Sequence, residues 1–296
     1  EFRRVLFRSF YTGVMGLIVS DEDANTLWLR GVEERAHHSL TLKKTNGRPQ
    51  CERVGFRVFM DDDLMKAKAH FDRTGIKSEF VTVAHQDRTL HFNDPAGTPV
   101  ELVATMKTVP RMHTKKHMHR GAAALRMDHY QVLVPDVMAN AKFYMDLGFR
   151  ISDYIVVESA GKVVGTFLHR KDNPWDIVFL QRSGPRFHHG GYVVESFNDI
   201  VRACDIAGNL GFKDRLEHGP GRHGIAALLM TRLASSTERI SRSLIVSRIS
   251  PGCSRIWLAG LPRRSSSTTT PRGTASIPSS STRAGERLAI VAPDSG

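Results

Sequence analysis

Residues 125–136 read Leu-Arg-Met-Asp-His-Tyr-Gln-Val-Leu-Val-Pro-Asp, and this stretch decides the fold. Its β-branched and aromatic residues, ended by Pro135, predict a buried strand of about eight residues. Apolar residues near helical spacing follow, and Gly148 ends the predicted helix. His129 lies near the start of the strand, where burying an unsatisfied polar group costs about 1–3 kcal/mol. Taken alone, the pattern favours a hydrogen-bonded core histidine over a ligand.

Length and composition exclude several classes of protein. A chain of 296 residues can form two domains of ordinary size. No apolar run approaches the roughly 20 residues that cross a bilayer, and residues 1–9 lack the apolar core of a secretory signal. The three cysteines (Cys51, Cys204 and Cys253) are odd in number and far apart, which argues against a disulfide framework. We therefore expect a cytoplasmic protein with no membrane partner.

The net charge of +12 is concentrated in one part of the chain. Residues 226–296 contain ten Arg and three acidic residues, so the preceding 225 residues carry only +5, spread without a basic stripe. A nucleic-acid-binding surface would need clustered basic residues within the folded part. The charge pattern therefore argues against a nucleic-acid partner.

The chain contains an internal repeat. Phe10-Tyr11 followed by Gly16-Leu17-Ile18 matches Phe143-Tyr144 followed by Gly148-Phe149-Arg150-Ile151, each a helix end that leads into a strand. The two aligned glycines are 132 residues apart. A repeat of this length indicates two homologous domains rather than a solenoid.

Each copy in turn contains smaller modules. In the first copy a strand at 53–59 precedes a helix at 61–74, and strands at 80–84, 89–92 and 99–103 follow. The order is strand, helix, three strands. The predicted fold class is α+β, with paired βαβββ modules in two homologous domains, the first lacking its N-terminal part and the second its C-terminal part.

The domain boundaries follow from this pattern. We predict a non-native leader at 1–9, a structural domain at 10–106, a linker at 107–122 and a catalytic, metal-binding domain at 123–225. The linker contains three irregularly spaced histidines, which we interpret as solvated rather than as a metal site.

Residues 226–296 differ in character from the rest. They contain no Lys, Asn, Gln, His, Phe or Tyr, whereas Arg, Ser, Thr and Pro are abundant. One interpretation is a disordered basic tail that is open to phosphorylation. The other, which we favour, is an out-of-frame and disordered continuation, because no Asp-Pro-x-Gly turn and glutamate-bearing strand follow His223, whereas the first copy has this turn and Glu101.

Two histidines hold equivalent places in the second copy. His129 and His189 each begin the first strand of a module, so a pseudo-twofold axis would bring both rings to one cavity. Two imidazoles and one carboxylate with open positions suit non-haem Fe(II). The first copy has Val54 opposite His189 and therefore lacks that ligand. We therefore predict a structural first domain and a catalytic second domain.

Six ordered motifs carry a resemblance to a known family. They are Met127-Asp128-His129, Val134-Pro135-Asp136, Leu147-Gly148-Phe149-Arg150, His169-Arg170-Lys171, Gly184-Pro185-Arg186-Phe187-His188-His189 and Gly219-Pro220-Gly221-Arg222-His223-Gly224. Over residues 10–225 the chain resembles the type I extradiol ring-cleavage dioxygenases of the vicinal oxygen chelate (glyoxalase/bleomycin resistance/dioxygenase) superfamily. It is most similar to the homoprotocatechuate (3,4-dihydroxyphenylacetate) 2,3-dioxygenase and catechol 2,3-dioxygenase branch.

The resemblance implies a set of site residues. His129 and His189 match metal ligands, and His223 matches a catalytic histidine that hydrogen-bonds the substrate or oxygen. The third ligand of the family, a glutamate, falls at Arg242, and a tyrosine that lines the site falls at Arg232.

Three residues of the substrate pocket depart from the family pattern. Trp175 stands where a histidine is usual, and an indole cannot exchange a proton near neutral pH. His218 replaces an arginine that faces a substrate carboxylate, and Gln131 replaces an asparagine. We interpret His188 as pointing away from the site, and the His37-His38 pair as structural.

The predicted function is oxidative cleavage of a catechol-type diol beside its hydroxyls, with O2 and Fe(II), or with Mn(II) in its place. The expected partners are this small molecule, O2 and further copies of the chain in a homo-oligomer. Two other classes stay open: a metal-free small-molecule-binding or inactive protein, which the missing glutamate favours, and a glyoxalase-like metal lyase or isomerase.

Overall fold

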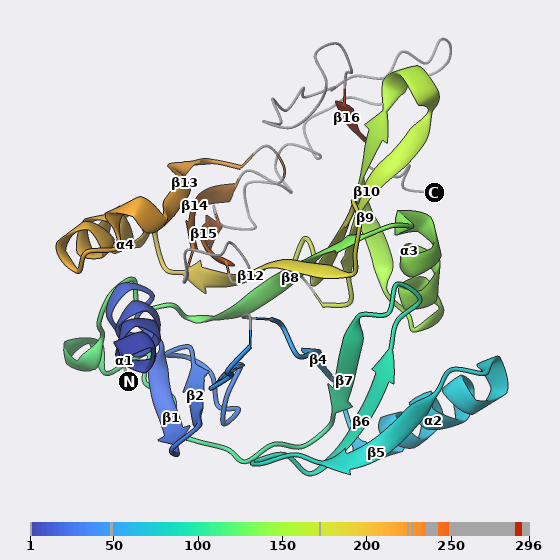
Figure 1. Ribbon diagram of the computed structural model, residues 1–296, viewed down its shortest axis with the longest axis horizontal. Helices are drawn as coiled ribbons and strands as arrows, with labels where there is room; N and C mark the ends of the chain where they lie inside the picture. The colour runs from blue at the N-terminus through green and yellow to red at the C-terminus, as the bar shows by residue number, and fades with distance from the viewer. Residues whose placement is uncertain are drawn as a thin grey trace, which may run out of the picture.

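Strands β8 (Arg126–Val134) and β12 (Arg186–Val194) lie side by side at the centre of the molecule (Figure 1). In the computed structural model, which describes residues 2–47, 50–171, 173–223, 225, 228–234, 242–248 and 288–291, they pair antiparallel. Both belong to a nine-stranded sheet with the order β13-β14-β15-β12-β8-β11-β10-β9-β16. The stretch that opens the sequence pattern is therefore a central strand.

The sheet is symmetric about its central pair. On one side β8 pairs in parallel with β11 (Ile177–Gln181), and β10 (Lys162–His169) and β9 (Arg150–Val157) follow outward. On the other side β12 pairs in parallel with β15 (Arg242–Arg248), followed by β14 (Leu228–Ala234) and β13 (Leu216–Arg222). A helix follows each central strand, α3 (Val137–Asp146) or α4 (Phe197–Asn209). The predicted pair of βαβββ modules is confirmed.

The first half repeats the same arrangement. Its four-stranded sheet has the order β4-β7-β6-β5, from β4 (Val54–Arg57), β5 (Ser78–Thr82), β6 (Arg88–Asn93) and β7 (Pro99–Val103), with α2 (Asp61–Thr74) between β4 and β5. A three-stranded sheet of β1 (Ile18–Glu22), β2 (Thr26–Arg30) and β3 (Leu40–Lys43) corresponds to β9, β10 and β11. Gly16 and Gly148, which the repeat aligns, both have positive φ angles, +74° and +89°. Left-handed backbone of this kind favours glycine.

Local signals explain where the helices begin and end. The Asp136 carboxylate accepts a hydrogen bond from the Ala139 N–H at 2.9 Å, which caps α3. Three aspartates in the first turn of α2 favour its N-terminus, and Gly75, at φ +72°, ends it. Among the described residues no helix is both long and apolar enough to cross a membrane.

The segments predicted to lie outside the domains take part in the fold. Helix α1 (Phe2–Ser9) continues into the π-helical turn η1 (Phe10–Val14), and Leu6 and Phe7 pack against a core cluster. The 107–122 segment hydrogen-bonds to the first half, for example from the Met112 N–H to the Val32 carbonyl at 2.7 Å, and forms a short helix, η2 (Lys116–Met118). That residues 1–9 are a non-native leader stays a prediction.

The expected disorder of residues 226–296 does not extend to the described residues 228–234, 242–248 and 288–291, which form strands. Strands β14 and β15 pair with each other, and β16 (Leu288–Val291) pairs with β9. Main-chain hydrogen bonds between strands tolerate many side chains, so the unusual composition did not reveal these strands. Residues 226–227, 235–241, 249–287 and 292–296 lie outside the described part.

Two apolar clusters join the halves of the chain. In one, η1 packs against α4 and β12, so that Phe10 meets Phe212 with ring centroids 5.5 Å apart. In the other, α2 packs against α3, where Phe71 and Phe143 stack at 6.2 Å. Each cluster takes buried residues from both halves, which fixes how the modules sit around the central strands.

Candidate metal centre

The central strand pair brings His129 and His189 together. Gln131 lies opposite His189 and Gly191 lies opposite His129, so the two histidines are diagonal neighbours on adjacent strands. Their Nε2 atoms are 3.2 Å apart. Both side chains are buried, at 3% and 4% exposure.

Each ring is held through its other nitrogen. His129 Nδ1 lies 2.7 Å from Asp128 Oδ2, and His189 Nδ1 lies 2.7 Å from His188 Nδ1. His188 therefore contacts the pair rather than pointing away from it. Carboxylate and hydrogen-bonded partners of this kind orient histidines that bind metals. The sequence motif contained Asp128, but no pattern assigned it this contact.

The donor set fits a metal ion. Two nitrogens 3.2 Å apart can bind one ion as neighbouring ligands, because nitrogen–metal bonds are about 2.1 Å long. Burial, and then the charge of His129 and His188, lowers the pKa of His189 well below its ordinary value. His189 is therefore neutral near pH 7, the form that binds metals.

Gly191 leaves room for the His129 ring. A Cβ atom at Gly191 would lie 2.5 Å from His129 Cε1, much closer than such atoms approach. The neighbouring Gly190 has no such contact, since its nearest atom is Met127 Cε at 3.5 Å. The His-His-Gly-Gly run was the signal in the sequence, but only the strand register shows which glycine matters.

The loop between β10 and β11 closes one side of the pair. Lys171 Nζ and Asn173 Nδ2 each donate to the Asp128 carbonyl at 3.2 Å. Trp175, 1% exposed, meets the His129 ring edge-on with centroids 5.7 Å apart. Its indole Nε1–H is buried and has no hydrogen-bond partner within the described part of the chain. An unpartnered buried donor beside two histidines marks a place for a bound acceptor.

The other predicted site residues lie at differing distances from the pair. The His223 ring is 5.9 Å from that of Trp175, and its Nδ1 lies 3.2 Å from the Ile225 carbonyl oxygen. Burial is the main cause that lowers the pKa of His223. Gln131 is two residues from His129 on β8, hence on the same face. His218 is exposed on β13, opposite Arg232 of β14, so it lies toward the edge of the sheet.

The position of a third ligand can be read from the strand register. In the first half Gly55 pairs with Glu101, and in the second Gly190 pairs with Ser243. This register equates Glu101 with Ser243, one residue after Arg242. The strand that contains both, β15, has the sequence Arg-Ser-Leu-Ile-Val-Ser-Arg and so contributes no carboxylate. Over the residues that the structure describes, the group of three metal-ligating side chains lies elsewhere, at Asp21, His37 and His85.

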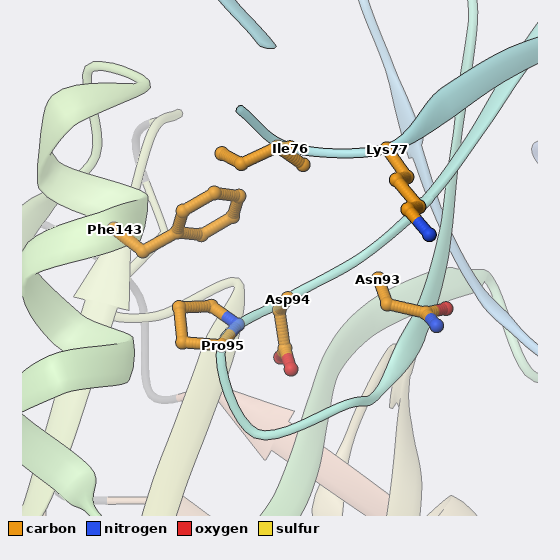
Figure 2. A pocket seen from close by; sticks show the side chains of 6 residues that line it. All are labelled: Ile76, Lys77, Asn93, Asp94, Pro95 and Phe143. Carbon is orange, nitrogen blue, oxygen red and sulfur yellow. The ribbon is translucent and has the colours of Figure 1, made fainter. Parts of the chain in front are cut away.

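A cavity between the halves is separate from this pair. It has a volume of about 240 Å³ and lies between the 93–95 turn and α3 (Figure 2). Asp94 Oδ2 accepts a hydrogen bond from Asn140 Nδ2 at 2.9 Å there, and burial raises the pKa of Asp94. These contacts join the first half to α3, and we assign them a structural role.

Paired βαβββ modules in two homologous halves define a protein of the vicinal oxygen chelate fold. The model of the Glyoxalase/Bleomycin resistance protein/Dioxygenase superfamily matches residues 126–230. A mutant homoprotocatechuate 2,3-dioxygenase from Brevibacterium fuscum is similar in structure, with a TM-score of 0.78, 31% identity, and coverage of 83% of this chain and 68% of that chain. A second structure of this enzyme, a complex with 3,4-dihydroxyphenylacetate, has a TM-score of 0.77 and 31% identity. The match covers 83% of this chain and 77% of that chain.

Curated relatives agree with this assignment. A manganese-dependent 2,3-dihydroxybiphenyl 1,2-dioxygenase from Geobacillus genomosp. 3 is 26% identical over 232 residues, which is 73% of each chain. A metapyrocatechase from Geobacillus stearothermophilus is 23% identical over 235 residues, 73% of this chain and 69% of that one. The chain belongs to the extradiol dioxygenases of the Glyoxalase/Bleomycin resistance protein/Dioxygenase superfamily.

Proposed function

We propose that the site catalyses extradiol cleavage of a catechol-type diol with O2 at a metal ion held by His129 and His189. The observation that carries this proposal is the buried pair of Nε2 atoms 3.2 Å apart, at the centre of a fold shared with extradiol dioxygenases. Fe(II) is the proposed ion, with Mn(II) as the alternative that one relative's name supports. When bound, the ion would lower the pKa of the diol and bring it beside O2.

His223 is the proposed proton-transfer residue. Its pKa is lowered mainly by burial, so the ring is neutral near pH 7 and can accept a proton from a diol hydroxyl. Trp175 cannot take this role, because an indole N–H only donates a hydrogen bond. Its buried Nε1–H is instead available to orient an oxygen atom of the substrate.

Gln131 and His218 are the proposed substrate contacts further from the ion. Gln131 shares a strand face with His129 and can both donate and accept hydrogen bonds. His218 lies near the surface, where its imidazole N–H could donate a hydrogen bond to an anionic substituent on the diol. The cytoplasmic location and the homo-oligomer stay predictions.

We propose that this chain lacks the third metal ligand and therefore binds the ion weakly. Support comes from the register that places Ser243 opposite Gly190 and from the absence of Asp and Glu in the sequence of β15. A reading-frame shift after codon 225 would explain both this loss and the composition of the tail. The same observation favours a second candidate, a metal-free small-molecule-binding or inactive protein.

Restoring the carboxylate separates these alternatives. The parent chain and the variants Ser243→Glu and Arg242→Glu would each be loaded with Fe(II) under argon, and the bound iron would be measured. Catechol or 3,4-dihydroxyphenylacetate would then be added with O2, and oxygen uptake and the yellow ring-fission product would be followed. We expect one glutamate variant to bind more iron and consume more oxygen than the parent, with His129→Asn in the same background as the inactive control. If neither variant takes up iron or oxygen, the dioxygenase assignment fails for this chain. Resequencing the gene beyond codon 225 tests the frame shift separately.

A further inference from the structure

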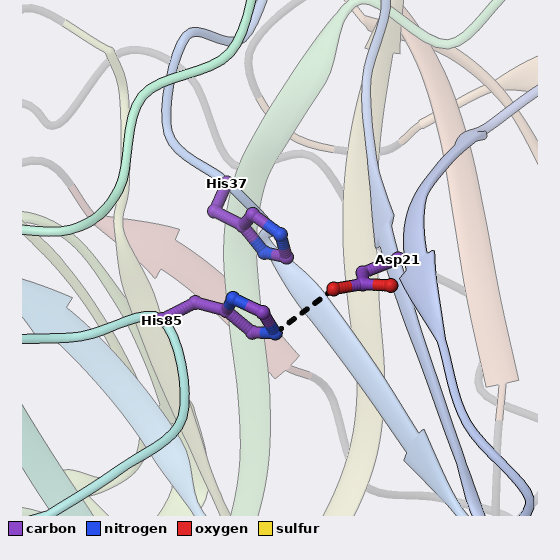
Figure 3. A group of neighbouring side chains, drawn as sticks. All are labelled: Asp21, His37 and His85. Carbon is purple, nitrogen blue, oxygen red and sulfur yellow. Dashed lines mark ion pairs between the residues drawn. The ribbon is translucent and has the colours of Figure 1, made fainter.

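A second cluster of metal-ligating side chains lies in the first half of the chain. Asp21 comes from β1, His37 from the loop between β2 and β3, and His85 from the turn between β5 and β6 (Figure 3). Their ligand atoms all lie within 4.8 Å of one another. Three segments far apart in sequence therefore bring two imidazoles and one carboxylate to one point.

The two imidazoles lie against each other. The rings of His37 and His85 stack with centroids 3.7 Å apart and an interplanar angle of 11°, so one ring has to turn before both can direct a nitrogen at the same ion. His85 Nε2 lies 3.4 Å from Asp21 Oδ2, as the dashed line in Figure 3 marks. The Trp28 ring meets His85 edge-on at 4.8 Å and limits its movement. Asp21, His37 and His85 therefore pack as one group beside Trp28.

Contacts outside the cluster orient the histidines. His37, 1% exposed, has its Nδ1 3.1 Å from His38 Nδ1, which leaves Nε2 for a ligand bond.

The backbone at two of the three positions is irregular. His85 has φ +65°, a left-handed conformation that non-glycine residues rarely adopt because it is strained. It is held there by the Lys107 N–H, which donates to the His85 carbonyl at 2.9 Å. The pairing of β1 with β2 shifts register between Val19 and Asp21, and such bulges re-aim side chains. Both irregularities occur at residues that supply the cluster.

We propose that Asp21, His37 and His85 bind a divalent first-row transition metal ion at a site separate from the His129–His189 pair. Two imidazoles and one carboxylate suit Zn(II), Mn(II) or Fe(II), whereas Mg²⁺ and Ca²⁺ prefer oxygen ligands alone. The Asp21 side chain is 48% exposed, so the ion can enter from solvent while His37 lies buried beneath. The site does not depend on the proposed dioxygenase activity.

Equilibrium dialysis of the whole chain against Zn²⁺, with bound metal counted per chain, tests the proposal. Asn tolerates the left-handed backbone at position 85, so His85→Asn removes a ligand without adding strain. Asp21→Asn is a second variant, and it should leave the fold intact because Asp21 is exposed. We expect each to weaken this Zn²⁺ site by about 100-fold or more, since even the loss of an outer partner of a ligand costs 10–100-fold.

Two control variants separate this site from the other one. His113→Asn removes an exposed histidine of the 107–122 segment and should leave Zn²⁺ binding unchanged. His129→Asn removes a ligand of the central pair and should leave the Asp21–His37–His85 site intact. If the parent binds no Zn²⁺, or if both His85→Asn and Asp21→Asn bind as much as the parent, the proposal is wrong. If Zn²⁺ binding is lost only in His129→Asn, the ion binds at the central pair. The proposal of a second site is then wrong, and the proposed function is unaffected.

Discussion

At the scale of single residues, the geometry of the central histidine pair depends on neighbouring residues outside the pair. Asp128 and His188 occupy the Nδ1 atoms, so the Nε2 atoms of His129 and His189 meet at 3.2 Å. Gly191 provides the space for the His129 ring. The positions of the two imidazole rings are thus set by hydrogen bonds and by the lack of a side chain at Gly191.

Gly191→Ala should displace the His129 ring. The added Cβ would lie 2.5 Å from that ring, and overpacking of this kind costs about 1–3 kcal/mol. We expect urea unfolding to show this loss of stability and metal titration to show weaker binding. Gly190→Ala is the matched control, because its Cβ would have ordinary contacts at 3.5 Å or more. Equal effects of the two substitutions would contradict the close-approach argument.

Cys51 should be an unreactive thiol. Burial is the main cause that raises its pKa from 9.0 to about 11, so at pH 8 the thiolate fraction falls about 100-fold. We expect iodoacetamide to modify Cys51 about 100-fold more slowly in the native chain than in urea, as followed by mass spectrometry.

The pH dependence of this thiol has a definite sign. The rate for native Cys51 should rise tenfold per pH unit up to about pH 11, because its folded pKa lies above its unfolded one. Its contribution to stability is complete below pH 9 and is lost as the pH rises from 9 to about 11. Fast alkylation at pH 8 in the folded chain would refute the burial of this group.

At the scale of elements, strand β8 and helix α3 form one unit. Pro135 ends the strand, and the Asp136 carboxylate accepts from the Ala139 N–H at 2.9 Å to begin the helix. This unit also helps to form the apolar cluster that α2 and α3 share, because α3 contributes Phe143 and Tyr144 to it. The local sequence at 134–139 therefore controls where strand β8, which contains His129, is anchored.

Asp136→Ala should destabilise the chain by about 1 kcal/mol through loss of this cap. Asp136→Asn retains a side-chain oxygen that can accept the same bond, so it should lose much less. Denaturant unfolding of both variants against the parent gives the comparison. A loss that is equal in the two variants would mean that the cap contributes nothing and that charge is responsible.

At the scale of the whole molecule, the halves share their cores. Phe71 of the first half is fully buried and stacks with Phe143 of the second at 6.2 Å. A sheet that carries the candidate site is thus supported by helices from both copies of the repeat. Because the cores are shared, the two homologous halves should unfold together.

Phe71→Ala should destabilise both halves. Removal of a buried phenylalanine costs about 3–5 kcal/mol, and we expect faster hydrogen exchange in β8 and β12 as well as in β4 to β7. Phe59→Ala is the control, since Phe59 is 92% exposed and its loss should change stability by less than about 0.5 kcal/mol. Faster exchange confined to the first half would show that the halves fold independently.

Sequence reasoning correctly predicted the elements whose signals are local. The helix at 61–74 has its predicted bounds, and β8 lies within the stretch 125–136. It was incomplete where pairing is long-range: three strands occur in the segment expected to be disordered, and the 107–122 segment is held by hydrogen bonds. Periodicity within a strand contains no information about which distant strand it joins.

The sequence by itself determined the modules and the equivalence of His129 and His189, because repeat symmetry and periodicity are properties of neighbouring residues. Only the tertiary structure decided the 3.2 Å separation of their Nε2 atoms, the need for glycine at 191, and the placing of Ser243 opposite Gly190. It also gathered Asp21, His37 and His85, which the sequence pattern had left as unrelated or structural residues. These features depend on strand register and on packing between segments that are remote in the chain, which no local pattern encodes.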